Sequence, residues 1–385
     1  MNFTLSDEQK AFCDLARQFA DNDLRPNAAH WDKDAVFPVE TIKSAGQLGF
    51  CSLYAAQSIG GLGLSRLDAS LVFERLSMGC TATTAYLTIH NMVTWMVGEF
   101  GKEALLATWG EALATGNKLA SYCLTEPGSG SDASSLKTKA VRDGNDYVIS
   151  GTKAFISGAG STDLLVVMAR TGDNTPRGIS AIAIPADTEG ISFGRKEEKM
   201  GWNCQPTRLL SFDSVRVPVE NRLGEEGEGF KLAMKGLDGG RINIASCSVG
   251  TAQQALNTAR DYMKDRKQFG KPLADFQALQ FKLADMNTDL VAARQLVRLA
   301  ATRLDDKHLE ATTFCAMAKR FATDVGFRVC NEALQIHGGY GYIKEYPLER
   351  YVRDTRVHQI LEGTNEVMRL IIARRLLSEQ FTELD

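Results

Sequence analysis

The spacing of apolar residues changes twice along the chain, and these changes limit the possible folds more than any other feature of the sequence. Residues 1–118 repeat apolar side chains at the period of an α-helix. Residues 119–228 instead contain short apolar runs separated by Gly, Asp, Asn and Pro. In residues 229–385 the helical period returns in long stretches. The sequence therefore predicts an α+β multidomain protein, with an N-terminal helical domain, a middle β-domain and a C-terminal helical domain at these boundaries.

The first part of the chain should form amphipathic helices. Ser6 and Gln9 have the spacing of a capping box at a helix start, so we expect the first helix at residues 6–21. Pro26 is expected to end it. The same period predicts further helices at 39–48, 67–79, 81–99 and 102–115.

The middle part carries the signals of antiparallel strands. Runs such as 164–168 and 179–184 are apolar, and residues 143–146 read Asp-Gly-Asn-Asp, which is typical of a hairpin turn. The long helices that parallel βαβ crossovers need are missing. We therefore expect an antiparallel β-sandwich or barrel.

The last part contains very long helical stretches dominated by Ala, Leu, Arg, Lys and Gln. The expected helices cover 229–264, 276–304, 309–336 and 365–380. Four long helices in succession predict a four-helix bundle.

Composition excludes several classes of protein. No apolar stretch approaches the ~20 residues that span a bilayer, so no membrane span is expected. The formal charge of −3 gives no overall attraction for nucleic acid. The eight Cys contain no C-x-x-C pair and the five His have no metal-ligand spacing, so we expect neither a disulfide framework nor a metal site. The N-terminus resembles neither a secretion signal nor a transit peptide, which predicts a bacterial-type cytoplasmic protein.

Familiar signatures of nucleotide and hydrolase sites are missing. The chain contains no G-x-G-x-x-G after a strand, no G-x-x-x-x-G-K-[ST] and no H-E-x-x-H. It also offers no nucleophile elbow for a Ser/His/Asp hydrolase. A classical dinucleotide-binding fold is therefore disfavoured.

Four segments have unusual residues, although each also has an ordinary structural explanation. Residues 122–132 enter a Gly-rich loop whose backbone N–H groups could approach a planar ring or a phosphate; an ordinary turn is the alternative. Residues 266–272 place cations beside an aromatic side chain, or form a solvated loop between helices. Residues 335–342 end a helix with glycines that could contact phosphate oxygens, or simply stop the helix. Residues 360–366 place Glu362 in apolar surroundings, either as a base or as a solvated neighbour of a helix cap.

Taken together, in this order and with these separations, the four segments resemble the signatures of the acyl-CoA dehydrogenase family, and the resemblance covers essentially the whole chain. It implies a helical domain, a β-domain and a four-helix bundle, assembled as a homotetramer that is a dimer of dimers. It also implies that FAD lies between the β-domain and the bundle, with part of its site supplied by a neighbouring subunit. Such a site would explain the missing dinucleotide signature.

The resemblance assigns the chemistry to Glu362, which would remove a proton from Cα of an acyl-CoA thioester while hydride leaves Cβ for flavin N5. The enolate would be stabilised by the backbone N–H of Glu362 and by a ribityl hydroxyl of FAD. Some relatives carry the base on a bundle helix, immediately before the residue that matches Arg241. Here that position is Gly240, so Glu362 is the only base that the resemblance supports.

Binding residues are also implied by the resemblance. Those expected along the acyl-CoA are Ser131, Asp238, Arg241 and Arg374. Those expected around FAD are Tyr122, Leu124, Thr125, Ser131, Phe155, Ile156, Ser157, Arg266, Phe269, Gln277, Gln335, Gly338, Gly339, Thr364 and Glu366.

Substrate and partner follow less directly. Segments 79–86, 201–208 and 239–247 resemble most closely the branch of the family that oxidises isobutyryl-CoA to methacrylyl-CoA in valine breakdown. Butyryl-CoA and 2-methylbutyryl-CoA are alternative substrates, because one methylene is worth only ~1–3 kcal/mol of discrimination. Electron-transfer flavoprotein is the implied electron acceptor, and the length of 385 residues argues against an oxygen-using oxidase. A non-catalytic assembly protein on the same fold is the alternative of another class.

Overall fold

Helices form the first part of the chain in the computed structural model, which describes residues 4–378. The expected capping box is present, because the Ser6 hydroxyl accepts a hydrogen bond from the backbone N–H of Gln9. Apolar faces of these helices meet around Leu24, Phe73 and Tyr86. The helices are α1 (Asp7–Phe19), α2 (Arg25–Lys33), α3 (Val39–Gln47), α4 (Arg66–Ser77), α5 (Thr81–Phe100) and α6 (Glu103–Ala114).

One expectation for this part was wrong, since Pro26 does not end the helical stretch. A turn of π-helix, Ala20–Leu24, continues α1 and leads directly into α2. Pro26 lies in the first turn of α2. Proline is tolerated there because the first backbone N–H groups of a helix have no acceptor within the helix.

The middle part forms an eight-stranded sheet with the order β6-β7-β3-β2-β4-β5-β8, in which β1 also pairs with β4. Most pairs are antiparallel, and the β2–β3 hairpin turns between Asp143 and Asp146 as predicted. The pairs β1–β4 and β2–β4 are parallel, which the sequence analysis did not predict. The strands are β1 (Ala120–Cys123), β2 (Lys139–Asp143), β3 (Asp146–Ser157), β4 (Leu164–Arg170), β5 (Ile179–Pro185), β6 (Ile191–Lys196), β7 (Thr207–Pro218) and β8 (Arg222–Leu223).

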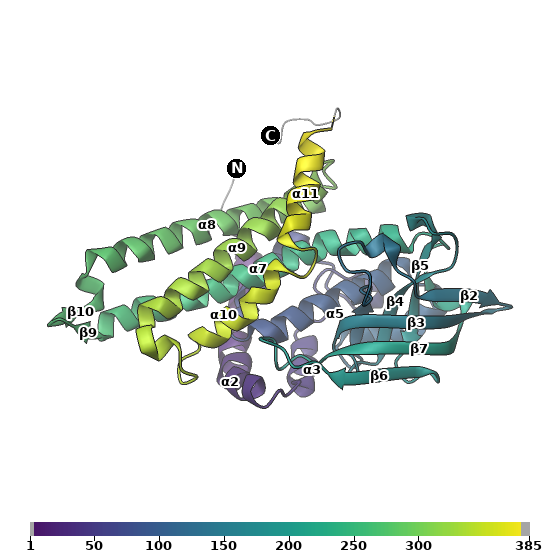
Figure 1. Ribbon diagram of the computed structural model, residues 1–385, viewed down its shortest axis with the longest axis horizontal. Coiled ribbons are helices and arrows are strands. Elements are labelled where there is room, and N and C mark those ends of the chain that lie inside the picture. Colours follow the sequence, from purple (N-terminus) through teal and green to yellow (C-terminus); the bar gives the residue numbers. More distant parts are fainter. Residues whose placement is uncertain (1–3, 379–385) are drawn as a thin grey trace.

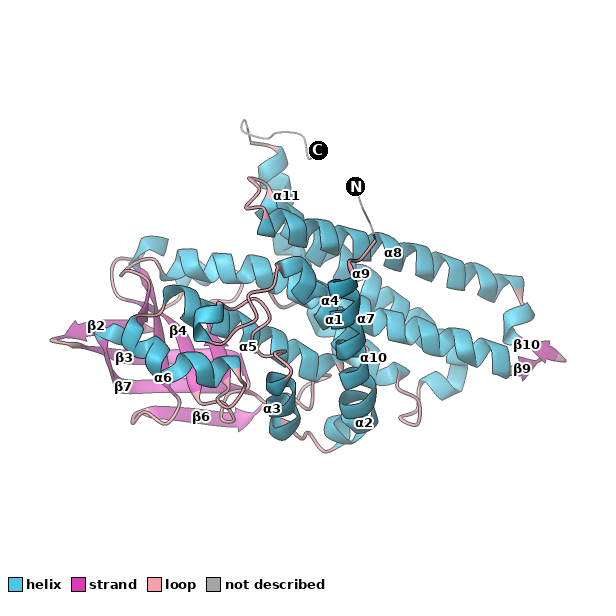
Figure 2. Cartoon of the chain, turned by 180° about the vertical axis from the view of Figure 1, so that it is seen from behind, coloured by secondary structure: helices cyan, strands magenta, loops and turns pink. Residues whose placement is uncertain are grey.

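Strand β4 is buried along its whole length because it lies between two apolar layers. On one face Leu165 shares a core with Ile149 of β3. On the other face Leu164 shares a core with Val93 of α5. Figure 2 shows α5 and α6 in front of the strands from this side. The double burial explains the uninterrupted apolar run in the sequence.

Three long helices lie side by side beyond the sheet: α7 (Gly229–Asp265), α8 (Gln277–Asp305) and α9 (Ala311–His337) (Figure 1). A small hairpin, β9 (Lys267–Gln268) and β10 (Lys271–Pro272), joins α7 to α8 at the end farthest from the sheet.

Two shorter helices complete this part. Helix α10 (Leu348–Arg356), which the sequence analysis missed, packs Leu348 and Tyr351 into the core of the long helices. Helix α11 (Asn365–Leu376) projects away from the long helices. Residues 379 and 380 of the expected last helix lie outside the described residues. The predicted succession of helical, β and helical domains is confirmed.

Some features are absent from residues 4–378. No helix in this range combines the length and the apolar character needed to cross a membrane. Nor does the range contain three or more His, Cys, Asp or Glu side chains grouped so that they could hold a metal ion. All eight Cys are buried free thiols, and a buried free Cys packs as a small apolar residue.

Candidate active site

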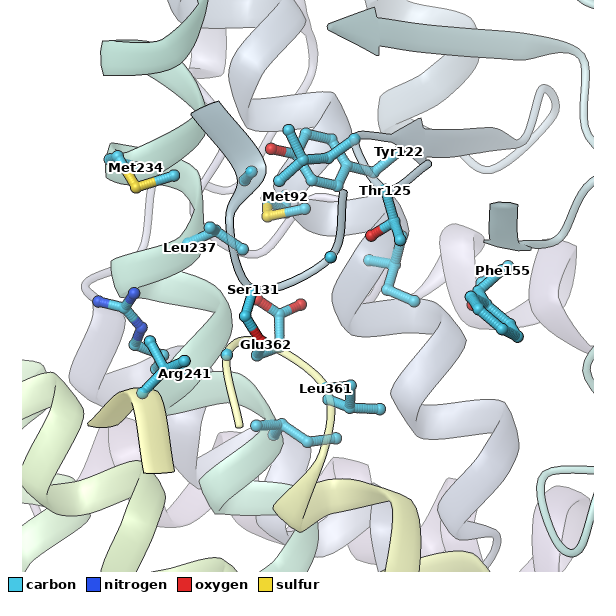
Figure 3. Close-up of a pocket in the computed structure, with 18 of the residues that line it drawn as sticks. Met92, Tyr122, Thr125, Ser131, Phe155, Met234, Leu237, Arg241, Leu361 and Glu362 are labelled. Atoms are coloured by element: carbon cyan, nitrogen blue, oxygen red, sulfur yellow. The ribbon is translucent and has the colours of Figure 1, made fainter. Parts of the chain in front are cut away.

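A cavity of about 340 Å³ lies where the β-domain meets α5, α7 and the loop before α11. Figure 3 shows the Glu362 carboxylate inside it, with Met234 and Leu237 on one side and Phe155 on the opposite side. Many of the residues singled out from the sequence line this cavity, although they come from distant segments. These are Tyr122, Leu124, Thr125, Ser131, Phe155, Ile156, Ser157, Arg241 and Glu362.

Glu362 stands in a sharply turned loop. Its φ is +57° and that of Gly363 is +86°, so both residues adopt the left-handed conformation. For a residue other than Gly this conformation costs about 1–3 kcal/mol and persists only where the surroundings impose it. Immediately afterwards, the Thr364 hydroxyl accepts a hydrogen bond from the backbone N–H of Val367 and caps α11. The backbone N–H of Glu362 makes no hydrogen bond within residues 4–378 and is therefore free for a ligand.

The environment of Glu362 makes its carboxyl group a suitable base near neutral pH. Its Oε2 atom is buried and has no hydrogen-bond partner in the described part of the chain. Burial raises the pKa of Glu362 to about 7, although the cations Arg241 and Lys319 oppose this rise. A general base works best when its pKa lies close to the operating pH.

Helix α7 approaches this carboxylate closely at Gly240. A Cβ atom placed on Gly240 would lie 2.5 Å from Oε2 of Glu362, closer than real Cβ atoms come to any neighbour. The carboxylate therefore occupies the space of a side chain at position 240. A base on α7 at that position and a base at position 362 exclude one another sterically in this conformation.

Arg241, one residue further on, brings a buried positive charge to the cavity. Its Nη1 atom donates to Oδ1 of Asp238 at 2.6 Å, and Oδ2 of Asp238 accepts from Thr312 at 2.7 Å. The Nε atom of Arg241 is buried without a partner among residues 4–378. Asp238 thus orients Arg241 and does not itself line the cavity.

A second hollow, of about 450 Å³, lies at the other end of α7 and α9. It gathers Arg266, Gly338 and Gly339. The guanidinium carbon of Arg266 lies 5.4 Å from the centre of the Tyr340 ring. From Arg241 to the end of α7 at Asp265 the helix is about 36 Å long, at the usual rise of about 1.5 Å per residue. Within a single chain the two sites therefore lie far apart.

Family profiles match three consecutive parts of the chain. The N-terminal, middle and C-terminal domains of acyl-CoA dehydrogenases match residues 6–117, 121–215 and 227–377. This chain belongs to the acyl-CoA dehydrogenase family. Members of the family are FAD-dependent oxidoreductases.

Individual acyl-CoA dehydrogenases are similar to this chain over nearly its whole length. It is 56% identical over 375 residues to mitochondrial isobutyryl-CoA dehydrogenase of Bos taurus, covering 97% of this chain and 90% of that protein. The solved structure of butyryl-CoA dehydrogenase from Megasphaera elsdenii superposes with a TM-score of 0.95 at 40% identity, covering 98% of this chain and 100% of that one. PigA with FAD and proline superposes with a TM-score of 0.94 at 28% identity, covering 98% and 99%. The predicted family, fold and enzyme class are thereby confirmed.

Several residues that the family resemblance implied lie in neither hollow. Phe269 is 94% exposed at the tip of the β9–β10 hairpin, with its ring edge-on to Phe276. Thr364 serves as the cap of α11, and Glu366 is exposed in the first turn of that helix. The remaining residues outside both hollows are Asp238, Gln277, Gln335 and Arg374. Their assigned roles stay predictions.

The sequence analysis missed an ion pair that holds the Gly-rich loop. Lys153 of β3 is completely buried, and its Nζ atom donates to Oε1 of Glu126 and to the carbonyl oxygen of Leu124, both at 2.9 Å. Glu126 also accepts the backbone N–H groups of Lys137 at 2.6 Å and Thr138 at 2.9 Å. A Lys that precedes an Ala-Phe-Ile run in a strand was the signal available in the sequence.

Replacing Lys153 by Met should destabilise the protein strongly. The variant leaves the Glu126 carboxylate without its cation, and breaking a buried pair in this way costs about 3–5 kcal/mol. Urea unfolding followed by circular dichroism measures the loss. The double variant Lys153→Met/Glu126→Gln, which buries no charge at this place, should recover part of it. Equal stability of Lys153→Met and the parent protein would contradict this account.

Proposed function

We propose that this acyl-CoA dehydrogenase converts isobutyryl-CoA to methacrylyl-CoA with FAD as its cofactor and Glu362 as its base. The observation that carries the proposal is the Glu362 carboxylate, which lies in the cavity and has a pKa of about 7. Its buried Oε2 atom has no hydrogen-bond partner among residues 4–378. The 56% identity to a mitochondrial isobutyryl-CoA dehydrogenase supports the branched substrate.

Glu362 would take the proton from Cα of the thioester. Carbon acids of this kind lose a proton only if the developing enolate oxygen is stabilised by hydrogen-bond donors. The free backbone N–H of Glu362 is one such donor, since it makes no hydrogen bond within residues 4–378. A substrate that fills the cavity would exclude water and strengthen both interactions.

The residues of the cavity fit a flat aromatic cofactor. Phe155 lines the cavity, and its side chain is 71% exposed. Its backbone has a φ of +57°. The ring therefore offers an apolar surface against which a flat ring could lie. Cβ atoms built on Gly128 and Gly130 would meet nothing within 4 Å, so the Gly-rich loop leaves room for a ligand. When bound, FAD would supply the acceptor for the hydride from Cβ.

The opposite side of the cavity would hold the acyl group. Met92, Met234 and Leu237 give this side an apolar lining (Figure 3). An apolar pocket discriminates between acyl groups that differ by one methyl or methylene by only ~1–3 kcal/mol. Butyryl-CoA and 2-methylbutyryl-CoA are therefore expected as weaker substrates of the same site.

The second hollow supports assembly with further copies of this chain. Arg266, Gly338 and Gly339 would bind the FAD pyrophosphate of a neighbouring subunit, since they lie far from Glu362 in their own chain. We therefore propose a homotetramer built as a dimer of dimers. Electron-transfer flavoprotein is the proposed electron acceptor, and the cytoplasm the proposed location.

Anaerobic titration of the FAD-loaded enzyme with a panel of acyl-CoAs tests the proposal. Isobutyryl-CoA should bleach the flavin band at the lowest concentration, with butyryl-CoA and 2-methylbutyryl-CoA needing more. Preference for straight-chain acyl-CoAs with acyl chains about twice as long as isobutyryl would contradict the substrate assignment. A colourless protein that binds no FAD would instead favour the alternative of an assembly protein.

A further inference from the structure

We propose that Lys319 is a positioning residue for the reaction: it holds the Glu362 loop in its turned conformation and sets the pH range in which Glu362 accepts a proton. The inference rests on the proposed role of Glu362 as the base. It assigns a function to a cation that lies outside the substrate cavity.

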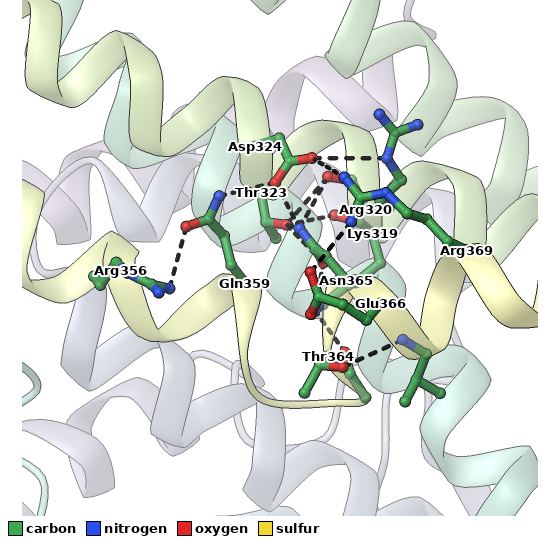
Figure 4. A network of polar contacts seen from close by, with 12 residues as sticks. Lys319, Arg320, Thr323, Asp324, Arg356, Gln359, Thr364, Asn365, Glu366 and Arg369 are labelled. Carbon is green, nitrogen blue, oxygen red and sulfur yellow. Dashed lines mark hydrogen bonds and ion pairs between the residues drawn. The ribbon is translucent and has the colours of Figure 1, made fainter. Parts of the chain in front are cut away.

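Within residues 4–378, both hydrogen bonds of the Lys319 ammonium group go to the segment that follows Glu362. Lys319 lies in α9 and is completely buried. Its Nζ atom donates to the carbonyl oxygen of Gly363 at 2.7 Å. It also donates to Oδ1 of Asn365 at 2.8 Å (Figure 4). Two of the three protons of the ammonium group therefore hold this segment, one through the backbone carbonyl of Gly363 and one through the side chain of Asn365.

Other residues of α9 hold the same loop on both sides of Glu362. After the base, the amide of Asn365 donates to Asp324 at 2.7 Å and to the Thr323 hydroxyl at 3.0 Å. Before the base, the amide of Gln359 donates to Asp324 at 2.8 Å. The left-handed conformation of Glu362 is thus imposed from both ends, as strained backbone at a functional site requires.

Stability alone does not account for Lys319. A buried cation costs several kcal/mol of desolvation unless a carboxylate compensates it closely. Among residues 4–378 no carboxylate forms an ion pair with Lys319, in contrast to Lys153, which is paired with Glu126. The negative charges that favour the ammonium form of Lys319 are Glu362, Asp324 and Glu366, none of which forms an ion pair with it within residues 4–378. The cost of burying Lys319 is explained if its charge acts on Glu362 and its hydrogen bonds hold the loop that carries Glu362.

Charges from several elements act on Glu362. Arg241 from α7 and Lys319 from α9 both oppose the rise of the Glu362 pKa that burial causes. Two phenols also face it, Tyr122 from β1 and Tyr54 from the segment after α3; burial raises the pKa of each, and the Glu362 charge adds to this. Both phenols are neutral near pH 7, so Arg241 and Lys319 are the charged groups that oppose the effect of burial on the Glu362 pKa.

The ionisation of Lys319 itself is compatible with this role. Burial lowers the pKa of Lys319 to about 8, while the Glu362 charge supports the ammonium form. His358, which also lies near Lys319, is buried and has a pKa of about 3, so it is neutral at working pH. Near pH 7 Lys319 is therefore positively charged, and replacing it by a neutral residue removes this charge from beside the loop.

Two neutral variants of the FAD-loaded enzyme separate the two parts of the proposal. Lys319→Met removes the charge and both hydrogen bonds, whereas Lys319→Gln removes the charge but keeps a donor for Gly363. In both variants the acid limb of the pH profile of kcat/KM should move up by about one unit from its position near pH 7, because a neighbouring charge shifts a pKa by about that amount. The plateau of kcat should fall about tenfold in Lys319→Met and less in Lys319→Gln.

The double variant Lys153→Met/Glu126→Gln is the matched control, since it removes a buried Lys whose charge does not act on Glu362 and leaves no unpaired carboxylate. Its acid limb, measured on the FAD-loaded enzyme, should coincide with that of the parent. The proposal is overturned if both Lys319 variants bind FAD and keep the parent acid limb, or if this double variant shifts the limb equally. If Glu362→Gln retains full turnover, the proposed role of Glu362 as the base is wrong. If Glu362→Gln is inactive but the Lys319 variants keep the parent acid limb, only the proposed role of Lys319 is wrong.

Discussion

The Glu362→Gln variant should bind FAD and acyl-CoA but turn over at least about a hundredfold more slowly, since a general base contributes typically 10²–10⁴-fold to a rate. The amide has nearly the shape of the carboxyl group but cannot take up the Cα proton. In single-turnover experiments with isobutyryl-CoA, the slow step should be flavin reduction itself. Reduction of the flavin at the parent rate would show that Glu362 is not the base.

Unfolding measurements supply the control for this variant. Because the pKa of Glu362 is raised in the folded protein from 4.5 to about 7, the carboxylate opposes folding progressively as the pH rises through this window, and not below it. Above pH 7 the neutral Gln variant should therefore be at least as stable as the parent. A large loss of stability would mean that low activity reflects misfolding instead of a missing base.

Gly240→Ala should keep the fold and lose most of the activity. The added methyl group would lie 2.5 Å from Oε2 and 2.8 Å from the carboxyl carbon of Glu362, so this side chain must move away. A displacement of about 1 Å in a reacting group can lower a rate by about a hundredfold. Meanwhile Ala is favoured over Gly inside a helix by about 0.5–1 kcal/mol, so the free energy of unfolding should not fall greatly. The measurements are kcat and urea unfolding.

Gly239→Ala, at the preceding position of α7, is the matched control for this second prediction. Its methyl group would meet the guanidinium Nη1 of Arg66 at 2.4 Å, and not Glu362. Arg66 lies outside the cavity, with its guanidinium over the Tyr54 ring. Both variants thus push aside the end of one flexible side chain, but only Gly240→Ala displaces the base. Similar losses of kcat in the two variants would contradict the steric explanation.

The succession of domains could be predicted because it depends on local patterns. Apolar residues at helical spacing led to α4, α5 and the three long helices, and the Asp143–Asp146 turn led to the β2–β3 hairpin. Local signals are ambiguous at two other places. Pro26 was expected to end a helix but lies in the first turn of α2. Helix α10 is short and rich in charged residues, so its apolar face is narrow.

A candidate for the base could also be named from the sequence, because a short motif contains Glu362 and a Gly occupies the alternative position. Its reactivity could not be predicted. The Glu362 pKa, the contact with Gly240 and the hydrogen bonds of Lys319 depend on groups that are distant in the chain and meet only when α7, α9 and the loop before α11 pack together. The sequence by itself specifies which side chains are available. Burial and neighbouring charges shift a pKa according to the distances between groups. Only the tertiary structure decides those distances.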